Sequence, residues 1–412
     1  MMLKQKTKFK QTEIGRIPED WEIKTLSGAI EINPKRELKK GMKAKYVSMQ
    51  DLKEFNKKIQ DYIYRSFNGG SKFQNGDTIM ARITPCLENG KTAFIDILED
   101  SEIGSGSTEF IVLSGKKGHS VDGFVYYLST SGKMRSDAIA SMTGTSGRQR
   151  VQTDLLEIKE VLLPPISEQM DIAKILSDLD AKIELNNKIN KVLEEIGQAL
   201  FNNLFIDNAS KNWKIARLRE YVDVIKGCSY KSEDLQDSDT ALVTLKSVNR
   251  GGGLNQEGYK EYVGEFKKEQ LLQDGDIVVA QTDLTQKAEV VGRPGIVNFI
   301  DRYKKLIASL DLQIIRPKKE LTRSFVYYLI KTDDFHNHAL SYTNGTTVLH
   351  LNKDAVPEFE FIVPDRDTLN KFDLIAKNML LRININNKEI DKLSKIRDSL
   401  LPKLMSGEIR TI

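Results

Sequence analysis

Apolar residues recur at steps of three and four over two long stretches of this chain. The first stretch covers residues 167 to about 205 and the second covers residues 372–404. Such steps are the period of an amphipathic or coiled-coil helix. Pro164 and Pro165 precede the first stretch, with Ser167 as an expected N-cap, and Gly407 follows the second as a stop signal. The pattern therefore predicts two long helices.

Short β-rich runs bounded by Gly, Asp and Asn fill the sequence before each long helix. GDTIMARI begins at Gly76 and GDIVVAQT begins at Gly275. FVYYLST at Phe124 and FVYYLIK at Phe325 have the pattern of short helices packed on a sheet. Each half then closes on an apolar strand stopped by proline, IKEVLLPP or FEFIVPD. These patterns indicate an α+β fold with a mainly antiparallel, curved sheet in each half.

The chain also repeats itself, with a period of about 200 residues. Trp21 in DWEIKTL matches Trp213 in NWKIARL, and IELNNK at residues 183–188 returns as ININNK at residues 383–388. The sequences between the matching blocks differ strongly. A shared scaffold that carries different loops is expected of two modules that recognise different ligands.

We therefore predict two duplicated α/β domains with curved, mainly antiparallel sheets, separated by two long, antiparallel, coiled-coil-like helices. The expected divisions are an N-terminal domain at residues 1–165, a central helical region at 166–208, a C-terminal domain at 209–365 and a distal helical region at 366–412. Some 40 helical residues would span roughly 60 Å.

Asn186 and Asn386 occupy equivalent places inside the two apolar stripes. A buried asparagine on such a seam lowers stability but fixes the register of the paired helices. The alternative is that each asparagine lies exposed at the edge of its stripe.

Composition narrows the function only slightly. The chain holds 62 basic and 58 acidic residues, a net charge of +4, which permits nucleic-acid binding without requiring it. No apolar run is long enough to span a membrane, and the basic N-terminus lacks the apolar region of a secretory signal. Cys86 and Cys228 lie far apart in sequence, so a reducing cytoplasm is expected.

The residues with catalytic potential do not form a familiar site. His336 and His338 are two apart, a spacing that suits neither a helical zinc pair nor a metalloprotease. Gly90-Lys91-Thr92 resembles the tail of a phosphate loop, but Pro85 stands where the first glycine belongs. We expect no metal site and no phosphate loop.

A nuclease centre remains an alternative at this stage, because Glu157 and Lys159 form an E-x-K triplet after Asp137 and Asp154. The competing interpretation is an exposed strand edge. A methyltransferase would need a glycine-rich cofactor loop and an N-P-P-Y type motif, and Asn33-Pro34-Lys35 is not one. The residues alone thus favour a binding protein.

Side chains suited to DNA gather in three places of each module, since base edges are read by Arg, Lys, Asn and Gln and phosphates by Lys, Arg, Ser and Thr. In the first module they are Gln50, Lys53, Arg82, Thr84, Lys91, Arg148, Gln149 and Arg150. In the second they are Lys246, Asn249, Arg250, Gln281, Thr282, Asp283, Thr285, Thr346, Thr347 and His350. The alternative for each is a solvated loop.

Four segments resemble the specificity subunits of type I restriction–modification enzymes. They are IPEDWE at residues 17–22, LPPISEQ at 163–169, NNK at 186–188 and LLPKLMSGEI at 400–409. The duplicated layout extends the resemblance over the whole chain. The second module departs from it with PDRDTLN at residues 364–370, where the first has the fuller PPISEQ.

The resemblance implies a non-catalytic, cytoplasmic subunit in which each target-recognition domain reads half of a bipartite, asymmetric site in double-stranded DNA. It implies that the helices set the half-site spacing and dock two modification subunits, which bind S-adenosylmethionine and methylate adenine. Restriction subunits would add ATP- and magnesium-dependent translocation and cleavage, so this chain would hold no cofactor itself. Two other classes stay open: a fused restriction endonuclease, and a coiled-coil scaffold that binds no DNA.

Overall fold

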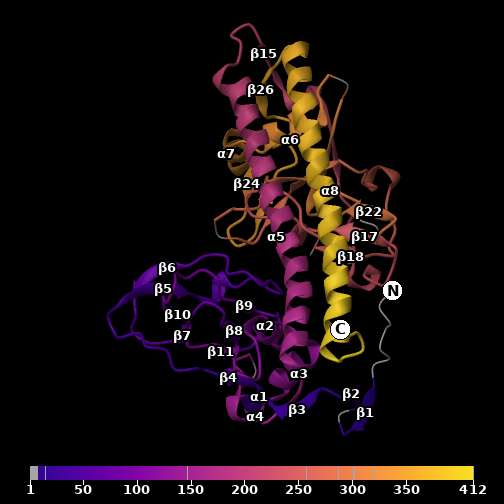
Figure 1. Ribbon diagram of the computed structural model, residues 1–412. Helices are drawn as coiled ribbons and strands as arrows, with labels where there is room; N and C mark the ends of the chain where they lie inside the picture. Colours follow the sequence, from indigo (N-terminus) through magenta and orange to yellow (C-terminus); the bar gives the residue numbers. More distant parts are fainter. Residues whose placement is uncertain are drawn as a thin grey trace, which may run out of the picture. The chain divides into compact units, whose positions relative to one another are not determined.

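The computed structural model describes residues 8–13, 15–145, 147–256, 258–285, 287–299, 302–318 and 320–411 (Figure 1). The first seven residues lie outside this range. They are part of the basic N-terminal segment that we expect is not a secretory signal. The chain forms two compact units. Unit 1 comprises Met1–Ile183 and Lys392–Ile412, and unit 2 comprises Glu184–Asp391. These limits fall inside the long helices, whereas the predicted domain boundaries lie at the helix ends and remain a prediction.

Unit 1 contains two four-stranded sheets. The first has the order β4 (Ile30–Ile32), β11 (Phe110–Gly115), β8 (Thr78–Ala81), β9 (Thr92–Phe94) and is antiparallel. The second has the order β6 (Ile63–Ser66), β5 (Lys43–Val47), β10 (Gly104–Gly106), β7 (Ser71–Phe73), in which β5 and β10 run parallel.

Shorter elements complete unit 1. Two-stranded ladders join β1 (Phe9–Thr12) to β2 (Gly15–Pro18), β3 (Glu22–Thr25) to β14 (Glu160–Leu163), and β12 (Met142–Thr143) to β13 (Arg150–Val151). The helices are α1 (Leu26–Ala29), α2 (Asp122–Thr130), α3 (Gly132–Ala140) and α4 (Thr153–Glu157). The core gathers Trp21, Ile111 and Phe124 with Ile172 of the long helix.

Unit 2 repeats this plan. One sheet has the order β16 (Val222–Lys226), β23 (Leu312–Pro317), β19 (Ile277–Ala280), β21 (Pro294–Ile296). Another has the order β18 (Tyr259–Glu261), β17 (Thr240–Val243), β22 (Lys305–Ala308), with β17 and β22 parallel. The remaining elements are β15 (Lys214–Arg217) with β26 (Glu360–Val363), β20 (Thr282–Asp283) with β25 (Leu349–Leu351) and β24 (Thr343–Asn344), α6 (Arg323–Ile330) and α7 (Asp333–Ser341). The predicted mixed fold, its mainly antiparallel pairing and the two FVYYL helices are confirmed.

The two predicted long helices are α5 (Ile166–Asn202) and α8 (Arg366–Met405), drawn as the long magenta and yellow ribbons in Figure 1. A π-helical turn, Asn203–Asp207, follows α5. Because α5 begins at Ile166, Ser167 lies in its first turn and the expected N-cap at Ser167 is wrong. Among the described residues, neither these nor the shorter helices carry an apolar stretch that could cross a bilayer.

Asn186 and Asn386 are both fully buried between α5 and α8 in unit 2. Asn186 Nδ2 donates to Glu389 at 3.0 Å, and Asn386 Nδ2 donates to Asn190 Oδ1 at 2.8 Å. Asn190 in turn donates to Asn387 at 2.8 Å. These contacts show that the helices pair antiparallel there, and exposure at the stripe edge is wrong for both residues. The register role remains a prediction.

Candidate nucleic-acid interface

In unit 1, two clusters that are far apart in sequence lie side by side. The segment after β8 runs along the segment that leads into β13. Thr84 N donates to Gln149 O at 3.0 Å, and Val151 N donates to Arg82 O at 2.8 Å. The structure thus brings Arg82 and Thr84 next to Gln149 and Arg150, as one polar surface would require.

Arg150 is held at the edge of this surface by Glu109. Its Nε lies 3.0 Å from both carboxylate oxygens of Glu109, and its Nη2 lies 2.7 Å from Oε1. The hydrogen bond from Arg150 lowers the pKa of Glu109, and the same bond raises the pKa of Arg150. The Arg150 side chain remains 48% exposed. Glu109 occupies the Nε–Nη2 edge of the guanidinium, so its exposed Nη1 end remains to donate hydrogen bonds. Because the side chain is already held, little rotamer entropy remains to be lost on binding.

The other candidates of unit 1 lie near the same strand end. Lys91 Nζ donates to Met49 O at 2.9 Å, while Lys91 O accepts from Ala81 N at 3.0 Å. Lys91 therefore joins the 3₁₀ turn η1 (Met49–Asp51), which carries Gln50, to the end of β8. Gln50, Lys53 and Arg148 are exposed.

Unit 2 builds the corresponding surface from β20, β25 and β24. Thr282 lies opposite His350, and Gln281 O accepts from Leu351 N at 2.7 Å. His350 is exposed, as are Thr346 and Thr347 in the turn before β25. The two units therefore present different side chains on the same backbone arrangement.

Asp283 departs from its prediction as a DNA contact. It is 1% exposed, and its carboxylate accepts backbone N–H bonds from Thr285, Val290 and Val291 at 2.6–2.9 Å. Burial by itself would raise the pKa of Asp283, but the hydrogen bond from the Thr285 side chain, together with these backbone bonds, outweighs burial and the pKa is lowered. Asp283 supports the loop after β20 and has no surface to offer a base. Thr285 Oγ1, beside it, accepts from Glu289 N at 3.0 Å.

Lys246, Asn249 and Arg250 stand exposed in the loop that follows β17. Arg250 is ion-paired with Glu289 at 3.4 Å. Since Glu289 also contacts Thr285, this loop adjoins the loop after β20. The three clusters of predicted DNA contacts in the second module therefore lie in one region, as they do in the first module.

Glu109 and Asp311 were missed from the sequence. They occupy the same structural position, because Arg82 N donates to Glu109 O at 2.9 Å and Gln281 N donates to Asp311 O at 2.7 Å. Asp311 Oδ1 accepts from the Thr282 hydroxyl at 3.1 Å. The available signal was an acid at matching places in STEF and SLDL of the two copies.

Two of the four resemblance segments and Arg410, the residue directly after a third, meet in unit 1 at a buried polar network. Trp21 Nε1 donates to Glu168 at 2.8 Å, and Arg410 binds both oxygens of Glu168 at 2.6–2.7 Å and Asp20 at 2.7 Å. Glu168 is 3% exposed. In unit 2, Trp213 donates instead to Asp365 at 3.1 Å, at the surface. These motif residues are therefore structural and do not belong to the interface.

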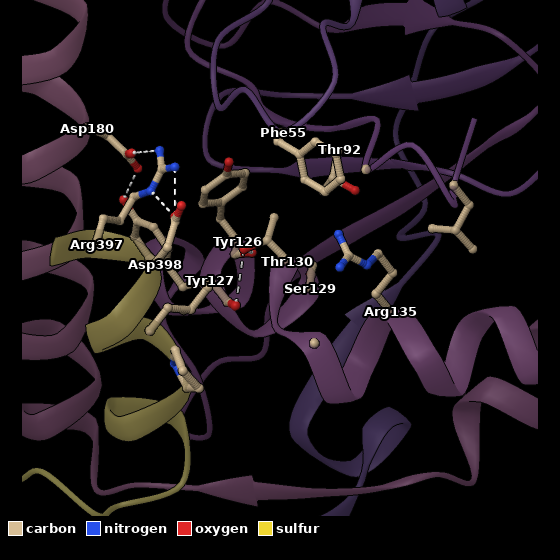
Figure 2. Close-up of a pocket in the computed structure, with 15 residues that line it drawn as sticks. Phe55, Thr92, Tyr126, Tyr127, Ser129, Thr130, Arg135, Asp180, Arg397 and Asp398 are labelled. Carbon is tan, nitrogen blue, oxygen red and sulfur yellow. Dashed lines mark hydrogen bonds and ion pairs between the residues drawn. The ribbon is translucent and has the colours of Figure 1, made fainter. Parts of the chain in front are cut away.

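A cleft of about 430 Å³ in unit 1 lies between α2, α3 and the two long helices (Figure 2). Tyr127 OH donates to Asp180 at 2.6 Å, and Arg397 Nη1 donates to the same carboxylate at 2.9 Å. Arg397 also contacts Asp398, as the dashed lines in Figure 2 mark. Burial, and then the nearby Asp180, raise the pKa of Tyr127. Because these groups satisfy one another, they form a structural junction at this end of the cleft.

The E-x-K triplet considered for a nuclease lies at the end of α4. Glu157 is the last residue of that helix, and Ile158 is 65% exposed beside it. The interpretation of this triplet as an exposed strand edge is therefore wrong, because the triplet lies at the end of a helix. Within the described part of the chain, no three His, Cys, Asp or Glu side chains are grouped so that they could hold a metal ion.

Comparison with known proteins identifies the fold and the family. The family model described as type I restriction modification DNA specificity domain matches residues 18–195 and again residues 210–394. The chain belongs to this family. The double match confirms both the internal repeat and the resemblance carried by the four segments.

Two relatives and one solved structure extend the comparison. The type I restriction enzyme MjaIX specificity subunit of Methanocaldococcus jannaschii is 26% identical over 98% of this chain and 97% of its own. The MjaVIII specificity subunit of the same organism is 23% identical over 98% and 96%. The crystal structure of the S subunit of a type I restriction–modification system from M. genitalium has a TM-score of 0.56 at 17% identity, over 93% of this chain and 96% of that one. That structure shares the fold.

Proposed function

We propose that this chain is the DNA sequence-recognition subunit of a type I restriction–modification complex and has no catalytic centre of its own. Each unit reads one half of a bipartite, asymmetric site. The observation that carries the proposal is the duplicated surface beyond β8 and β19, where the same backbone bonds present Arg82 and Arg150 in one unit and Gln281 and His350 in the other. One scaffold with two sets of polar side chains fits two different half-sites.

The proposal extends to the partners. The paired helices α5 and α8 set the spacing between half-sites and dock two modification subunits, which supply S-adenosylmethionine and adenine methylation. Restriction subunits supply ATP- and magnesium-dependent cleavage. Support comes from the family match and from apolar side chains left exposed along both helices, such as Leu185, Val192, Leu374 and Leu381. A complex that acts on genomic DNA implies a cytoplasmic location.

The test is a methylation map of cells that express the chain with its modification subunit. Replacing Arg148 and Arg150 with alanine should relax one half-site only, because losing a bidentate base contact costs about 1–3 kcal/mol, or about 5- to 150-fold in discrimination. Replacing Thr347 and His350 with alanine should relax only the other half-site. Lys133→Ala, which removes a cation that pairs with an acid one helical turn away, is the control.

Methylation that shows no bipartite sequence dependent on this chain would refute the proposal. So would relaxation of both half-sites by either variant, since each unit is proposed to read one half.

A further inference from the structure

A corner of unit 1 away from the predicted contacts carries bare positive charge. It is formed by the turn at residues 39–43 and by β6 with the residue after it, a pair of segments called here the basic hairpin. Its sequences, KKGMK and IYRSF, contain Lys39, Lys40, Lys43 and Arg65 and no acid. All four cations are exposed, and among the residues that the structure describes none of them is ion-paired.

The turn and the strand form one object. Gly41 N donates to Phe67 O at 2.8 Å, and Lys43 lies opposite Ser66 in the β5–β6 ladder. Arg65 lies opposite Ala44, on the other face. The hairpin therefore projects cations from both of its faces.

Aromatic rings take the place of acids beside two of these cations. Lys43 Nζ lies 5.5 Å from the Tyr64 ring centre, and Arg65 Cζ lies 4.0 Å from that of Tyr46. Tyr64 is itself 56% exposed. A ring face orients a cation without neutralising it, so the full charge remains available to an external anion.

Unit 2 supplies an internal comparison. Val47 and Val243 correspond, because Ser107 N donates to Val47 O at 3.2 Å and Ser309 N donates to Val243 O at 2.9 Å. Counting back along each strand, Lys43 corresponds to Asp239, which pairs with Lys304 at 2.9 Å.

The strand next to it shows the same difference. By the ladder registers, Tyr64 corresponds to Glu261, which is ion-paired with Arg302. By the same registers, the unit 1 counterpart of Lys304 is Glu102, which is bound to Lys45 at 3.0 Å. Unit 2 therefore pairs its charge at this position, whereas in unit 1 the available acid is taken by Lys45 and Lys43 is left unpaired.

Clustered like charges without counter-charges oppose folding, and they are compensated when a polyanion binds. We propose that the basic hairpin of unit 1 binds DNA phosphates, independently of sequence and outside the bases read by Arg82 and Arg150. The inference rests on the proposed function and adds to it an asymmetric grip: the first unit holds the duplex backbone more tightly than the second.

The test is the salt dependence of binding by the full chain to a mixed-sequence DNA duplex. The variant Lys39→Gln/Lys43→Gln/Arg65→Gln should bind more weakly and show a shallower plot of log affinity against log salt. Each lost phosphate contact reduces that slope by about 0.9, so a reduction of about two to three is expected.

A matched control removes three cations that are already paired with acids and lie outside the two long helices: Lys133→Gln/Lys231→Gln/Lys304→Gln. This control loses the same three positive charges as the hairpin variant, and its slope should fall by less than the value of about 0.9 for one phosphate contact. Equal slopes for the hairpin variant and the wild type would overturn the inference. An unchanged slope together with lost association with the modification subunit would also overturn it and assign the hairpin to an acidic protein surface. A wild-type chain that binds no DNA, alone or in its complex, would instead refute the proposed function.

Discussion

Gly197 stands inside α5, where glycine lowers helix stability, and the structure gives a reason for it. In unit 2 a Cβ at this position would lie 2.8 Å from Cε1 of Tyr328 and nearer still to the Tyr328 hydroxyl oxygen. Tyr328 is fully buried, with its ring centre 5.8 Å from that of Phe372. We predict that Gly197→Ala destabilises unit 2.

The magnitude follows from two opposing effects. Alanine gains about 1 kcal/mol over glycine in a helix interior. Displacing a packed ring costs roughly 1–3 kcal/mol as overpacking and up to about 5 kcal/mol if the ring loses its site. The net loss lies between about 0 and 4 kcal/mol, and its middle value of about 2 kcal/mol corresponds to about 30-fold in an opening equilibrium.

Hydrogen exchange followed by mass spectrometry measures this effect locally. Peptides from α6 should lose protection by that factor in Gly197→Ala, while peptides from α2 in unit 1 serve as an internal reference. Gly132→Ala is the matched control, because a Cβ at Gly132 meets nothing within 4 Å. Gly132→Ala should leave the protection of the α6 peptides equal to that of the wild type or slightly higher.

A double-mutant cycle makes the reasoning refutable. In a Tyr328→Ala background the clash is gone, so Gly197→Ala should become stabilising by up to about 1 kcal/mol. If Gly197→Ala raises protection in α6 without that background, or costs the same with it, then Tyr328 is not the reason for the glycine.

Two further predictions concern buried polar groups. Because the folded-state pKa of Asp283 is lowered, its contribution to stability is complete above the unfolded pKa and is lost as the pH falls through the folded value. Asp283→Asn should therefore cost roughly 1–3 kcal/mol of stability at pH 7 and lower the thermal midpoint there. Below about pH 4, the midpoint of the variant should fall less steeply with pH than that of the wild type. An unchanged midpoint at pH 7 would contradict this role. Asn186→Leu/Asn386→Leu should leave the urea midpoint equal or higher, yet broaden the distances between spin labels on α5 and α8 of unit 2; a single sharp distance would refute the register role.

Periodicity and repetition predicted most of the fold. The step of three and four located α5 and α8 closely, because a long amphipathic helix is determined by local spacing. FVYYL was identified as a short helix twice, and its repetition strengthened each identification. The N-cap at Ser167 failed because α5 already begins at Ile166.

The candidate site was predictable by region more than by residue. Residue type and repeat position located the clusters around Arg82, Arg150 and His350, which the structure then joined through backbone pairing. Asp283 looked equally suitable in sequence, but only tertiary contacts show that its carboxylate is turned inward. Glu109 was missed because its relation to Arg150 spans 41 positions along the chain.

The sequence by itself determined the architecture: two copies of one module, two amphipathic helices and a family. Local periodicity and internal repetition encode these features without reference to long-range contacts. Tertiary structure alone decided which charges remain available. Arg150 is ion-paired with Glu109, Asp283 is buried, and Lys43 is exposed without an ion pair. The composition of the chain does not distinguish these three charged residues. The physical reason is that the partner of a charge is chosen by spatial proximity, which pairing between distant strands creates and which sequence spacing does not record.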